Sequence, residues 1–353
     1  MNKLSIDIQE RVLHFIQPAG TSRGVYTERR IWLVTISNGQ NQGVGECAPL
    51  PDLSCDAMPP QQYYKVLRRF CDEIEQTGQL DVEALRPYPS MLFGLETAMR
   101  SLLFSHTSPL TPHLLFDTPF SRGEEGIPIN GLVWMGTYEE MEQRMEMKLQ
   151  QGFRCIKLKI GAIDFDQELE LLKRIRNRFG PREVELRVDA NGAFDYANGD
   201  ALYKLELLSQ FALHSIEQPI RAGQWANMAE LCRDAPLPIT LDEELIGIND
   251  PEQKRQLLHI IKPAYIVLKP SLHGGMMGCR EWISMASEEG IGHWITSALE
   301  SNVGLNAIAQ LCSALPHCGA KNQMMPQGLG TGMLFSDNIE MPLEIRGDKL
   351  WMK

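Results

Sequence analysis

The sequence predicts an α/β barrel that follows a smaller α+β unit, and three observations lead to this fold class. First, 353 residues exceed the length of one ordinary domain. Second, short apolar runs alternate with amphipathic helical stretches through the last two thirds of the chain, which is typical of parallel sheets. Third, seven such runs in about 200 residues fit a closed barrel better than an open doubly wound sheet. No G-x-G-x-x-G follows the first strands, so nothing favours a dinucleotide-binding fold.

The first third of the chain has the pattern of a mixed α+β unit. Strands are expected where β-branched and aromatic residues cluster around a turn, and helices where apolar residues recur at helical spacing. The expected elements are a strand at Ile31–Ile36, a turn at Asn38-Gly39, a strand at Gly43–Glu46, and helices at Tyr63–Gln76 and Met91–Phe104. Ser105–Gly126 is rich in Ser, Thr, Pro and Gly, which predicts a linker and a domain boundary near Gly126.

The alternation of strands and helices begins after this boundary. The expected strands are Ile127–Val133, Cys155–Ile160, Val184–Val188, Leu213–Ile216, Pro238–Leu241, Tyr265–Leu268 and Ile291–Ile295. The expected helices between them include Asp164–Phe179, Ala197–Gln210, Trp225–Asp234 and Met276–Glu289. Each strand and its helix form one unit of a barrel wall.

Charge and composition exclude several classes of partner. The net charge is −11 and no basic block is present, which argues against binding to nucleic acid or to an anionic membrane. No apolar stretch approaches the roughly 18–20 residues of a membrane span, and the charged N-terminus does not resemble a signal peptide. The eight cysteines are scattered without a C-x-x-C pair, so we expect reduced thiols in a cytoplasmic protein.

Polar or ionisable residues lie at the end of six of the predicted strands. They are Lys157 and Lys159 in IKLKI, Asp189 in LRVDAN, Glu217 in HSIEQP, Asp242 in PITLDEE, Lys269 in YIVLKP and Ser297 in HWITSALES. From Lys159 onward they follow one another at intervals of 25 to 30 residues, which is one β/α unit each time. The carboxyl ends of barrel strands meet at one mouth, so we expect these side chains to share a pocket.

Each of these residues also has a simpler interpretation. A single acidic residue after a strand is more often a helix N-cap, and a single lysine in a strand is usually solvated. The repeated spacing favours a site over these alternatives. Ser297 lacks a G-x-S-x-G context, so a nucleophilic serine is not expected. His214 and His293 lie inside apolar runs, and we expect them to be core or pocket-wall groups.

The residue types suit proton abstraction beside a carboxylate. Three acids close together need a counter-charge, and a hard divalent cation with oxygen ligands, such as Mg²⁺, provides one. Lys157 and Lys159 point to the same side of a strand, so their repulsion and partial burial are expected to lower the pKa of one amine. Lys269 is expected across the barrel, with the metal stabilising an enediolate between the lysines.

The ordered motifs resemble those of the enolase superfamily, in its muconate-lactonising-enzyme-like branch. The matching stretches are GVGECAPLP (43–51), INGL (129–132), IKLKIG (156–161), VDANGAF (188–194), IEQP (216–219), LDEE (241–244), LKPS (268–271), TSALESNVGL (296–305) and QGLGT (327–331). The resemblance covers nearly the whole chain. It implies a (β/α)7β modified TIM barrel at 127–328 and an α+β capping domain at 1–126, to which 329–353 returns.

The resemblance also implies roles for the strand-end residues. Asp189, Glu217 and Asp242 would hold Mg²⁺, with Mn²⁺ as a possible substitute. Lys159 would remove the α-proton and then protonate the departing hydroxyl in a syn elimination, and Lys269 would stabilise the enediolate.

Three further residues are expected to serve substrate binding. Lys157 would lie near the metal-bound carboxylate and help to lower the pKa of Lys159. Asn191 would contact the metal-binding carboxylates or the substrate carboxylate. Ser297 would line the far wall, beside a succinyl tail.

The expected substrate is a small carboxylate. TSALES (296–301), with TSRG (21–24) in a presumed capping loop, favours the dehydratases of this branch that form 2-succinylbenzoate from 2-succinyl-6-hydroxy-2,4-cyclohexadiene-1-carboxylate for menaquinone. Racemisation of N-succinylamino acids, or another epimerisation on the same scaffold, is the alternative. A non-catalytic ligand-binding barrel is the alternative from a different class. The oligomeric state stays open.

Overall fold

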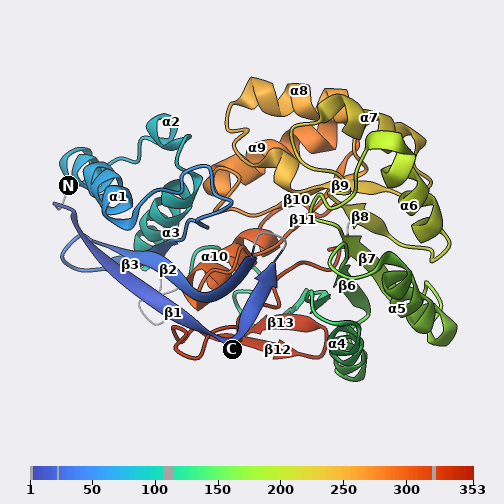
Figure 1. The fold of residues 1–353 in the computed structure, drawn as a ribbon. Helices are drawn as coiled ribbons and strands as arrows, with labels where there is room; N and C mark the ends of the chain where they lie inside the picture. Colours follow the sequence, from blue (N-terminus) through green and yellow to red (C-terminus); the bar gives the residue numbers. More distant parts are fainter. Residues whose placement is uncertain (1–2, 22–23, 106–113, 320–322) are drawn as a thin grey trace.

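The protein is described from a computed structural model that covers residues 3–21, 24–105, 114–319 and 323–353. The first part contains β1 (Ser5–Thr21), β2 (Gly24–Ser37), β3 (Gln42–Cys47), α1 (Pro60–Thr77), α2 (Val82–Leu85) and α3 (Pro89–Ser105). The second contains β4 (Ile127–Pro128), β5 (Gly131–Val133), α4 (Tyr138–Gln150), β6 (Cys155–Lys159), α5 (Phe165–Arg178), β7 (Glu185–Asp189), η1 (Ala197–Gly199), α6 (Asp200–Ser209), β8 (Ser215–Glu217), α7 (Trp225–Asp234), β9 (Ile239–Leu241), η2 (Glu243–Leu245), α8 (Pro251–Ile261), β10 (Tyr265–Leu268), α9 (Gly275–Glu288), β11 (Gly292–Ile295), α10 (Asn302–Ser313), β12 (Leu343–Arg346) and β13 (Lys349–Met352). Figure 1 shows the first part, in blue, beside the barrel.

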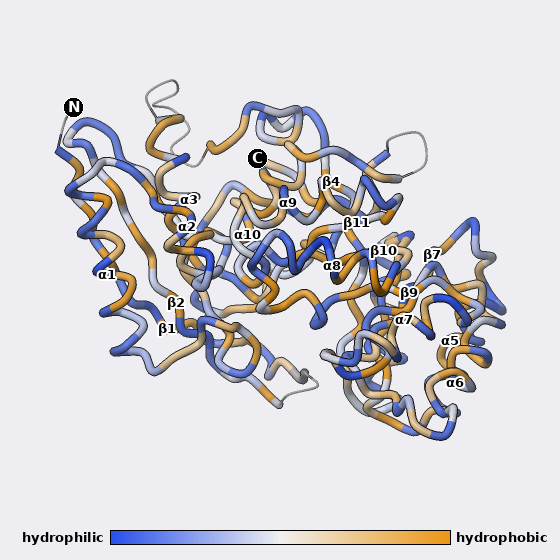
Figure 2. The backbone as a smooth tube through the Cα atoms, turned by 90° about the horizontal axis from the view of Figure 1, so that it is seen from above, coloured by the Kyte–Doolittle hydropathy of each residue, from blue (hydrophilic) through white to orange (hydrophobic). Residues whose placement is uncertain are grey.

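The first part is a three-stranded antiparallel sheet, β1-β2-β3, with helices packed against it. Helix α3 approaches β3 so closely that an ideal Cβ atom on Gly45 would lie 1.9 Å from the carbonyl oxygen of Gly94. Glycine at position 45 therefore permits this contact between sheet and helix. Figure 2 shows this unit from above, with α1 along one end of the molecule and α5 and α6 at the other.

The hairpin of β1 and β2 is much longer than the sequence predicted. Only the C-terminal half of β2, Ile31–Ile36, was expected, together with a capping loop at 21–24. In the structure β1 runs to Thr21 and β2 starts at Gly24. Residues 22–23 of that expected loop lie outside the described residues. Alternation along β1 is interrupted by exposed charged residues and by a register shift between His14 and Ala19, so its strand pattern is weak.

The second part is a parallel seven-stranded sheet in the order β11-β10-β9-β8-β7-β6-β5, curled into a barrel. Its two edges are linked by single bridges from Ile129 to Gln327 and from Thr296 to Gly328. Residues 327 and 328 thus occupy the place of an eighth strand. The predicted modified TIM barrel with a separate capping unit is confirmed.

Two of the predicted boundaries differ in the structure. The expected strand Ile127–Val133 is divided, because β4 pairs with β13 in another sheet and only β5 enters the barrel. The expected linker Ser105–Gly126 lies partly outside the described residues. In its described part, Phe116 and Phe120 are buried in the barrel core, so this stretch is packed rather than solvated.

Three clusters of buried apolar side chains hold the fold together. One fills the sheet and helices of the first part, the largest fills the barrel, and a third joins the two parts around Leu13, Leu50 and Leu299. The C-terminal segment also reaches the hairpin, since the Ile16 N–H donates to the Leu334 carbonyl at 2.9 Å. No helix among the described residues is both long and apolar enough to cross a membrane.

Candidate active site

The predicted site residues lie side by side at the carboxyl ends of neighbouring barrel strands. Lys159 ends β6, Asp189 ends β7 and Glu217 ends β8, and the parallel register pairs Lys159 with Asp189 and Asp189 with Glu217. Asp242 and Lys269 follow β9 and β10 directly. The structure thus brings together the residues that the 25- to 30-residue spacing predicted to meet.

Three carboxylates form the centre of this cluster. One oxygen from each of Asp189, Glu217 and Asp242 lies within 4.8 Å of the others, and all three side chains are buried. Asp242 Oδ1 is buried without a hydrogen-bond partner among the described residues. Oxygen donors at this spacing, one of them unsatisfied, fit a hard divalent cation. These residues can therefore hold such an ion.

Three lysines surround the carboxylates. Lys157 Nζ lies 2.6 and 2.7 Å from the two carboxylate oxygens of Glu217 and 2.8 Å from Asp189 Oδ2. Lys159 Nζ lies 2.6 Å from Asp189 Oδ2, and Lys269 donates to Asp242. The positive lysines therefore offset the negative charge of the buried carboxylates.

The electrostatics of the cluster differ from the expected repulsion between two lysines. Burial lowers the pKa of Lys157, but the surrounding carboxylates, led by Asp189, outweigh burial and raise this pKa above its ordinary value. The same balance, with Asp242 as partner, raises the pKa of Lys269. Lys157 is therefore not an amine with a lowered pKa, because the carboxylates around it outnumber its lysine neighbour.

The carboxylates themselves are shifted in opposite directions. Burial raises the pKa of Asp189, but the charges of Lys157 and Lys159 outweigh burial, and the net pKa is lowered. For Glu217, burial and the charge of Asp189 together raise the pKa well above its ordinary value. Repulsion between these acids is the strain that a bound cation would relieve.

Asn191 connects Lys159 to a further acid. Its side-chain oxygen accepts a hydrogen bond from Lys159 Nζ at 2.8 Å, and its Nδ2 donates to Glu243 Oε1 at 2.9 Å. Its backbone is left-handed, with φ of 44°, a conformation that asparagine tolerates better than most residues. Asn191 therefore fixes the direction of the Lys159 side chain.

Three site residues were not predicted from the sequence. Glu243 directly follows Asp242 and accepts a hydrogen bond from Asn191 Nδ2. Gln218 Oε1 accepts from the backbone N–H of Asp242 at 3.2 Å, which ties β8 to the loop after β9. Glu168 accepts from the backbone N–H groups of residues 161–163, which orders the loop after Lys159. The signal for Gln218 and Glu243 was their position directly after a predicted ligand.

A cavity of about 630 Å³ opens over this cluster. Both parts of the molecule contribute to it. Its wall includes Lys157, Lys159, Asn191, Glu217, Glu243, Lys269 and Ser297 from the barrel, and Gln17, Tyr26, Leu50 and Leu53 from the first part. This volume falls within the roughly 300–1,000 Å³ that small-molecule sites occupy. Ser297 lies in the wall as predicted, where its hydroxyl is 2.6 Å from that of Thr331.

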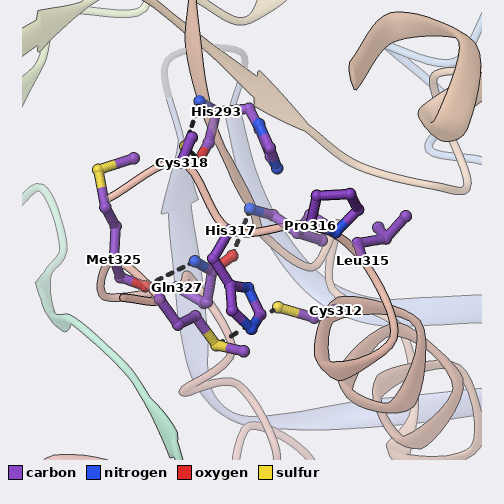
Figure 3. Close-up of a pocket in the computed structure, with 10 residues that line it drawn as sticks. His293, Cys312, Leu315, Pro316, His317, Cys318, Met325 and Gln327 are labelled. Carbon is purple, nitrogen blue, oxygen red and sulfur yellow. Dashed lines mark hydrogen bonds between the residues drawn. The ribbon is translucent and has the colours of Figure 1, made fainter. Parts of the chain in front are cut away.

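A second, much smaller cavity lies beside β11 (Figure 3). It is lined by sulfur and imidazole side chains, including those of His293, Cys312 and Cys318, and its volume of about 10 Å³ is close to that of one water molecule. Cys318 Sγ lies 3.0 Å from both the backbone nitrogen and the backbone oxygen of His293. Burial lowers the pKa of His293 to about 4, as expected for a neutral wall residue. The carboxylate cluster lies in the larger cavity, which is the candidate active site.

The family comparisons agree with this geometry. The family model described as "Enolase C-terminal domain-like" matches residues 140–351, and the model described as "MenC, N-terminal domain" matches residues 22–102. An o-succinylbenzoate synthase of Desulfotalea psychrophila is 43% identical to this chain, with 99% of each chain covered. An N-succinylamino acid racemase of Thermus thermophilus is 33% identical over 47% of this chain and 42% of the relative.

Solved structures give the same result. The crystal structure of MenC from Desulfotalea psychrophila has a TM-score of 0.81 and 39% identity, covering 99% of both chains. A dipeptide epimerase from Enterococcus faecalis has a TM-score of 0.83 at 17% identity, covering 99% of this chain and 97% of the other, which shows a shared fold. The chain therefore belongs to the enolase superfamily, in the muconate-lactonising-enzyme-like branch that includes the o-succinylbenzoate synthases.

Proposed function

We propose that this protein is a hydro-lyase that converts 2-succinyl-6-hydroxy-2,4-cyclohexadiene-1-carboxylate into 2-succinylbenzoate for menaquinone biosynthesis. The observation that carries the proposal is the placement of Lys159 and Lys269 at the ends of β6 and β10, with the three carboxylates on the strands between them. Full-length similarity to an o-succinylbenzoate synthase supports this substrate. The racemase match covers less than half of the chain and supports the alternative less.

The carboxylate set supports Mg²⁺ as the ion, because hard oxygen donors without sulfur or imidazole suit Mg²⁺, with Mn²⁺ as a substitute. Asp189, Glu217 and Asp242 would hold it. When bound, the ion would supply Lewis-acid stabilisation of negative charge on the substrate carboxylate. The amines of Lys157 and Lys269 add fixed positive charge around the same position.

The chain's own residues then account for the two proton movements. Lys159, as a neutral amine, takes the proton from the carbon beside the substrate carboxylate, and the electron pair forms an enediolate. The Lys159 ammonium next donates that proton to the departing hydroxyl on the same face. The C–O bond breaks, one water leaves, and the ring becomes aromatic. Lys269 stabilises the enediolate through its charge, and Asn191 holds Lys159 in place.

This scheme is tested by following the ultraviolet absorbance change as the diene becomes aromatic. Lys159→Ala should lower kcat by about 10²–10⁴-fold, the usual contribution of a general acid–base group. Lys173→Ala, which removes an exposed lysine on α5, should retain wild-type turnover. A Lys159→Ala enzyme with normal kcat would refute the mechanism.

The racemase alternative has its own signature. It predicts solvent-deuterium exchange into N-succinylamino acids without turnover of the cyclohexadiene. The non-catalytic alternative predicts neither reaction and no binding of Mg²⁺ or Mn²⁺. The dehydratase proposal predicts turnover of the cyclohexadiene that depends on the divalent ion.

We further propose that residues 1–126 form the capping domain and residues 127–328 the catalytic barrel. The separate apolar clusters of the two parts support this division, although Phe116 and Phe120, which precede residue 127, pack in the barrel cluster. The C-terminal segment contacts both parts, through Leu334 with the hairpin and through β13 with β4. A cytoplasmic location stays a prediction from the cysteine pattern.

A further inference from the structure

Arg29 of β2 is a buried cation whose hydrogen bonds all go to backbone carbonyls. It is 3% exposed. Its Nε donates to the Leu299 carbonyl at 3.1 Å, and its Nη2 donates to the Ala48 carbonyl at 2.6 Å and to the Ala298 carbonyl at 3.5 Å. Its Nη1 donates to the Pro49 carbonyl. One guanidinium therefore joins residues 48–49 of the capping domain to residues 298–299 of the barrel.

Both joined segments form part of the cavity wall. Leu50, directly after Pro49, lines the cavity, and so do Ala298 and Leu299, whereas Arg29 is not among the lining residues. Leu50, Ala298 and Leu299 also belong to the apolar cluster that joins the two parts. Arg29 can therefore act on a ligand only through the wall that it holds.

The wall segment is held in an unfavourable backbone conformation. Leu299 has a φ of 64°, in the left-handed region that large side chains rarely adopt. Such a conformation persists only where surrounding contacts impose it. The Arg29 bond to the Leu299 carbonyl is one such contact. Glu300 provides another, since it accepts from the Ala298 N–H at 2.6 Å and from the Ser271 hydroxyl at 2.5 Å.

The capping domain contributes a second buried charge to the same turn. Glu46 of β3 accepts from the Ser301 N–H at 2.9 Å and from the Gly304 N–H at 2.8 Å. The negative charges of Glu300 and Glu46 oppose the burial penalty that lowers the Arg29 pKa. Arg29 and Glu46, two buried ionisable residues of the capping domain, thus both bind the backbone of the barrel turn at 298–304.

The reacting groups are held by different contacts. Lys159 is fixed by Asp189 and Asn191, and Lys269 by Asp242. A change at Arg29 should therefore disturb the wall without disturbing proton transfer. A ligand anchored between the two lysines by its carboxylate would meet the wall with its non-reacting part.

We propose that Arg29 is a positioning residue that sets the shape of the wall formed by Leu50, Ala298 and Leu299, against which the succinyl part of the ligand packs. This inference rests on the proposed function and adds a specificity determinant to it. Its signature is a selective loss of affinity for ligands that carry the succinyl group.

The test compares two ligands that share a ring carboxylate, 2-succinylbenzoate and benzoate, by calorimetric titration with saturating Mg²⁺. Arg29→Met should weaken binding of 2-succinylbenzoate about tenfold, within the range for loss of hydrogen bonds to a charged group, and change benzoate binding less than about twofold. In turnover assays the same variant should raise KM and leave kcat within about threefold. Arg30→Met removes the neighbouring, partly exposed arginine that pairs with Glu10. It is the matched control and should leave the binding of both ligands unchanged.

A second variant tests whether Arg29 acts through Leu299. Glycine adopts a φ of 64° without contacts that impose it. Leu299→Gly should therefore itself weaken the binding of 2-succinylbenzoate selectively. Arg29→Met should then add less than about twofold in the Leu299→Gly background, because effects that share one contact are not additive. If Arg29→Met does not fold, Arg29→Lys replaces it, since lysine keeps the charge but cannot bridge both segments.

The outcomes separate this inference from the proposed function. Equal loss for both ligands, no loss for either, or losses that multiply in the double variant would overturn the role of Arg29. Wild-type protein that binds 2-succinylbenzoate but does not turn over the cyclohexadiene would refute the proposed function, and the binding comparison would still decide the inference. Wild-type protein that does not bind 2-succinylbenzoate would overturn both.

Discussion

At the scale of single residues, Asn191 connects the proposed base to the rest of the site. Its side chain accepts from Lys159 and donates to Glu243, and its left-handed backbone is one that glycine also adopts. Asn191→Gly therefore removes the two hydrogen bonds without straining the chain. We expect kcat to fall about 10–100-fold, because a hydrogen bond to a charged group contributes about 1.5–3 kcal/mol.

The measurement is the steady-state kinetics of cyclohexadiene dehydration. Asn198→Gly is the matched control, since Asn198 is another left-handed asparagine, with φ of 57°, that lies exposed in η1. KM should change less than about threefold in both variants. If the two variants had equal kcat, Asn191 would not be positioning Lys159.

Some of the site residues could be predicted from the sequence, and others could not. Lys159, Asp189 and Glu217 could be predicted because strand ends recur with the β/α unit, and the barrel converts that period into proximity. Glu168 and Arg29 could not, since their partners are backbone atoms, which carry no residue-type signal. Arg29 is bound to a carbonyl 270 residues away. No local pattern encodes such a contact.

At the scale of elements, the predictions succeed where the chain's period is strong. The helices expected at Tyr63–Gln76 and Met91–Phe104 correspond to α1 and α3, with ends that differ by one to three residues. The barrel strands match the apolar runs because they are buried on both faces. The β1 strand was missed because an edge strand with one partner carries exposed polar residues that blur the alternation.

The packing of α3 against α9 carries a titratable group of its own. Glu96 of α3 accepts from the backbone N–H groups of Met276 and Met277 in the first turn of α9, at 2.5 and 3.1 Å. Burial raises the pKa of Glu96 to about 7, although these N–H groups and the charges of Arg280 and Arg100 partly oppose the rise. The folded state therefore binds a proton here more tightly than the unfolded chain does.

The direction of the pH dependence follows from this raised pKa. The stabilisation from the Glu96 proton is fully present below an unfolded pKa of about 4.5 and is lost as pH rises through about 7. Glu96→Gln stays neutral, so its stability relative to wild type should increase by up to about 3 kcal/mol between pH 4.5 and pH 8. The check is urea unfolding at several pH values, with the exposed Glu73→Gln as control. A pH-independent difference between wild type and Glu96→Gln would contradict the raised pKa.

At the scale of the whole molecule, the two parts are joined more firmly than their separate cores suggest. The third apolar cluster spans both parts, and buried Arg29 and Glu46 of the capping domain bond to the turn at 298–304. Separating the domains would expose this cluster and leave both charges without their partners, which is costly. We therefore expect one cooperative unfolding transition rather than two.

This coupling determines how metal binding should affect the entire chain. An ion that binds only the folded carboxylate cluster stabilises by about 2.7 kcal/mol when its concentration is 100 times its dissociation constant. For a protein of this size we expect a rise in Tm of roughly 4 °C with Mg²⁺, reversed by a chelator. Asp242→Asn removes one ligand charge and should abolish most of this rise, whereas Asp250→Asn, at the N-cap of α8, should retain it. Scanning calorimetry shows whether the two domains unfold together. If they are coupled, Mg²⁺ shifts a single transition. If they are independent, a separate capping-domain transition would be insensitive to Mg²⁺. An identical Mg²⁺ response in wild type and Asp242→Asn would place the ion elsewhere and remove the carboxylate cluster as the metal site.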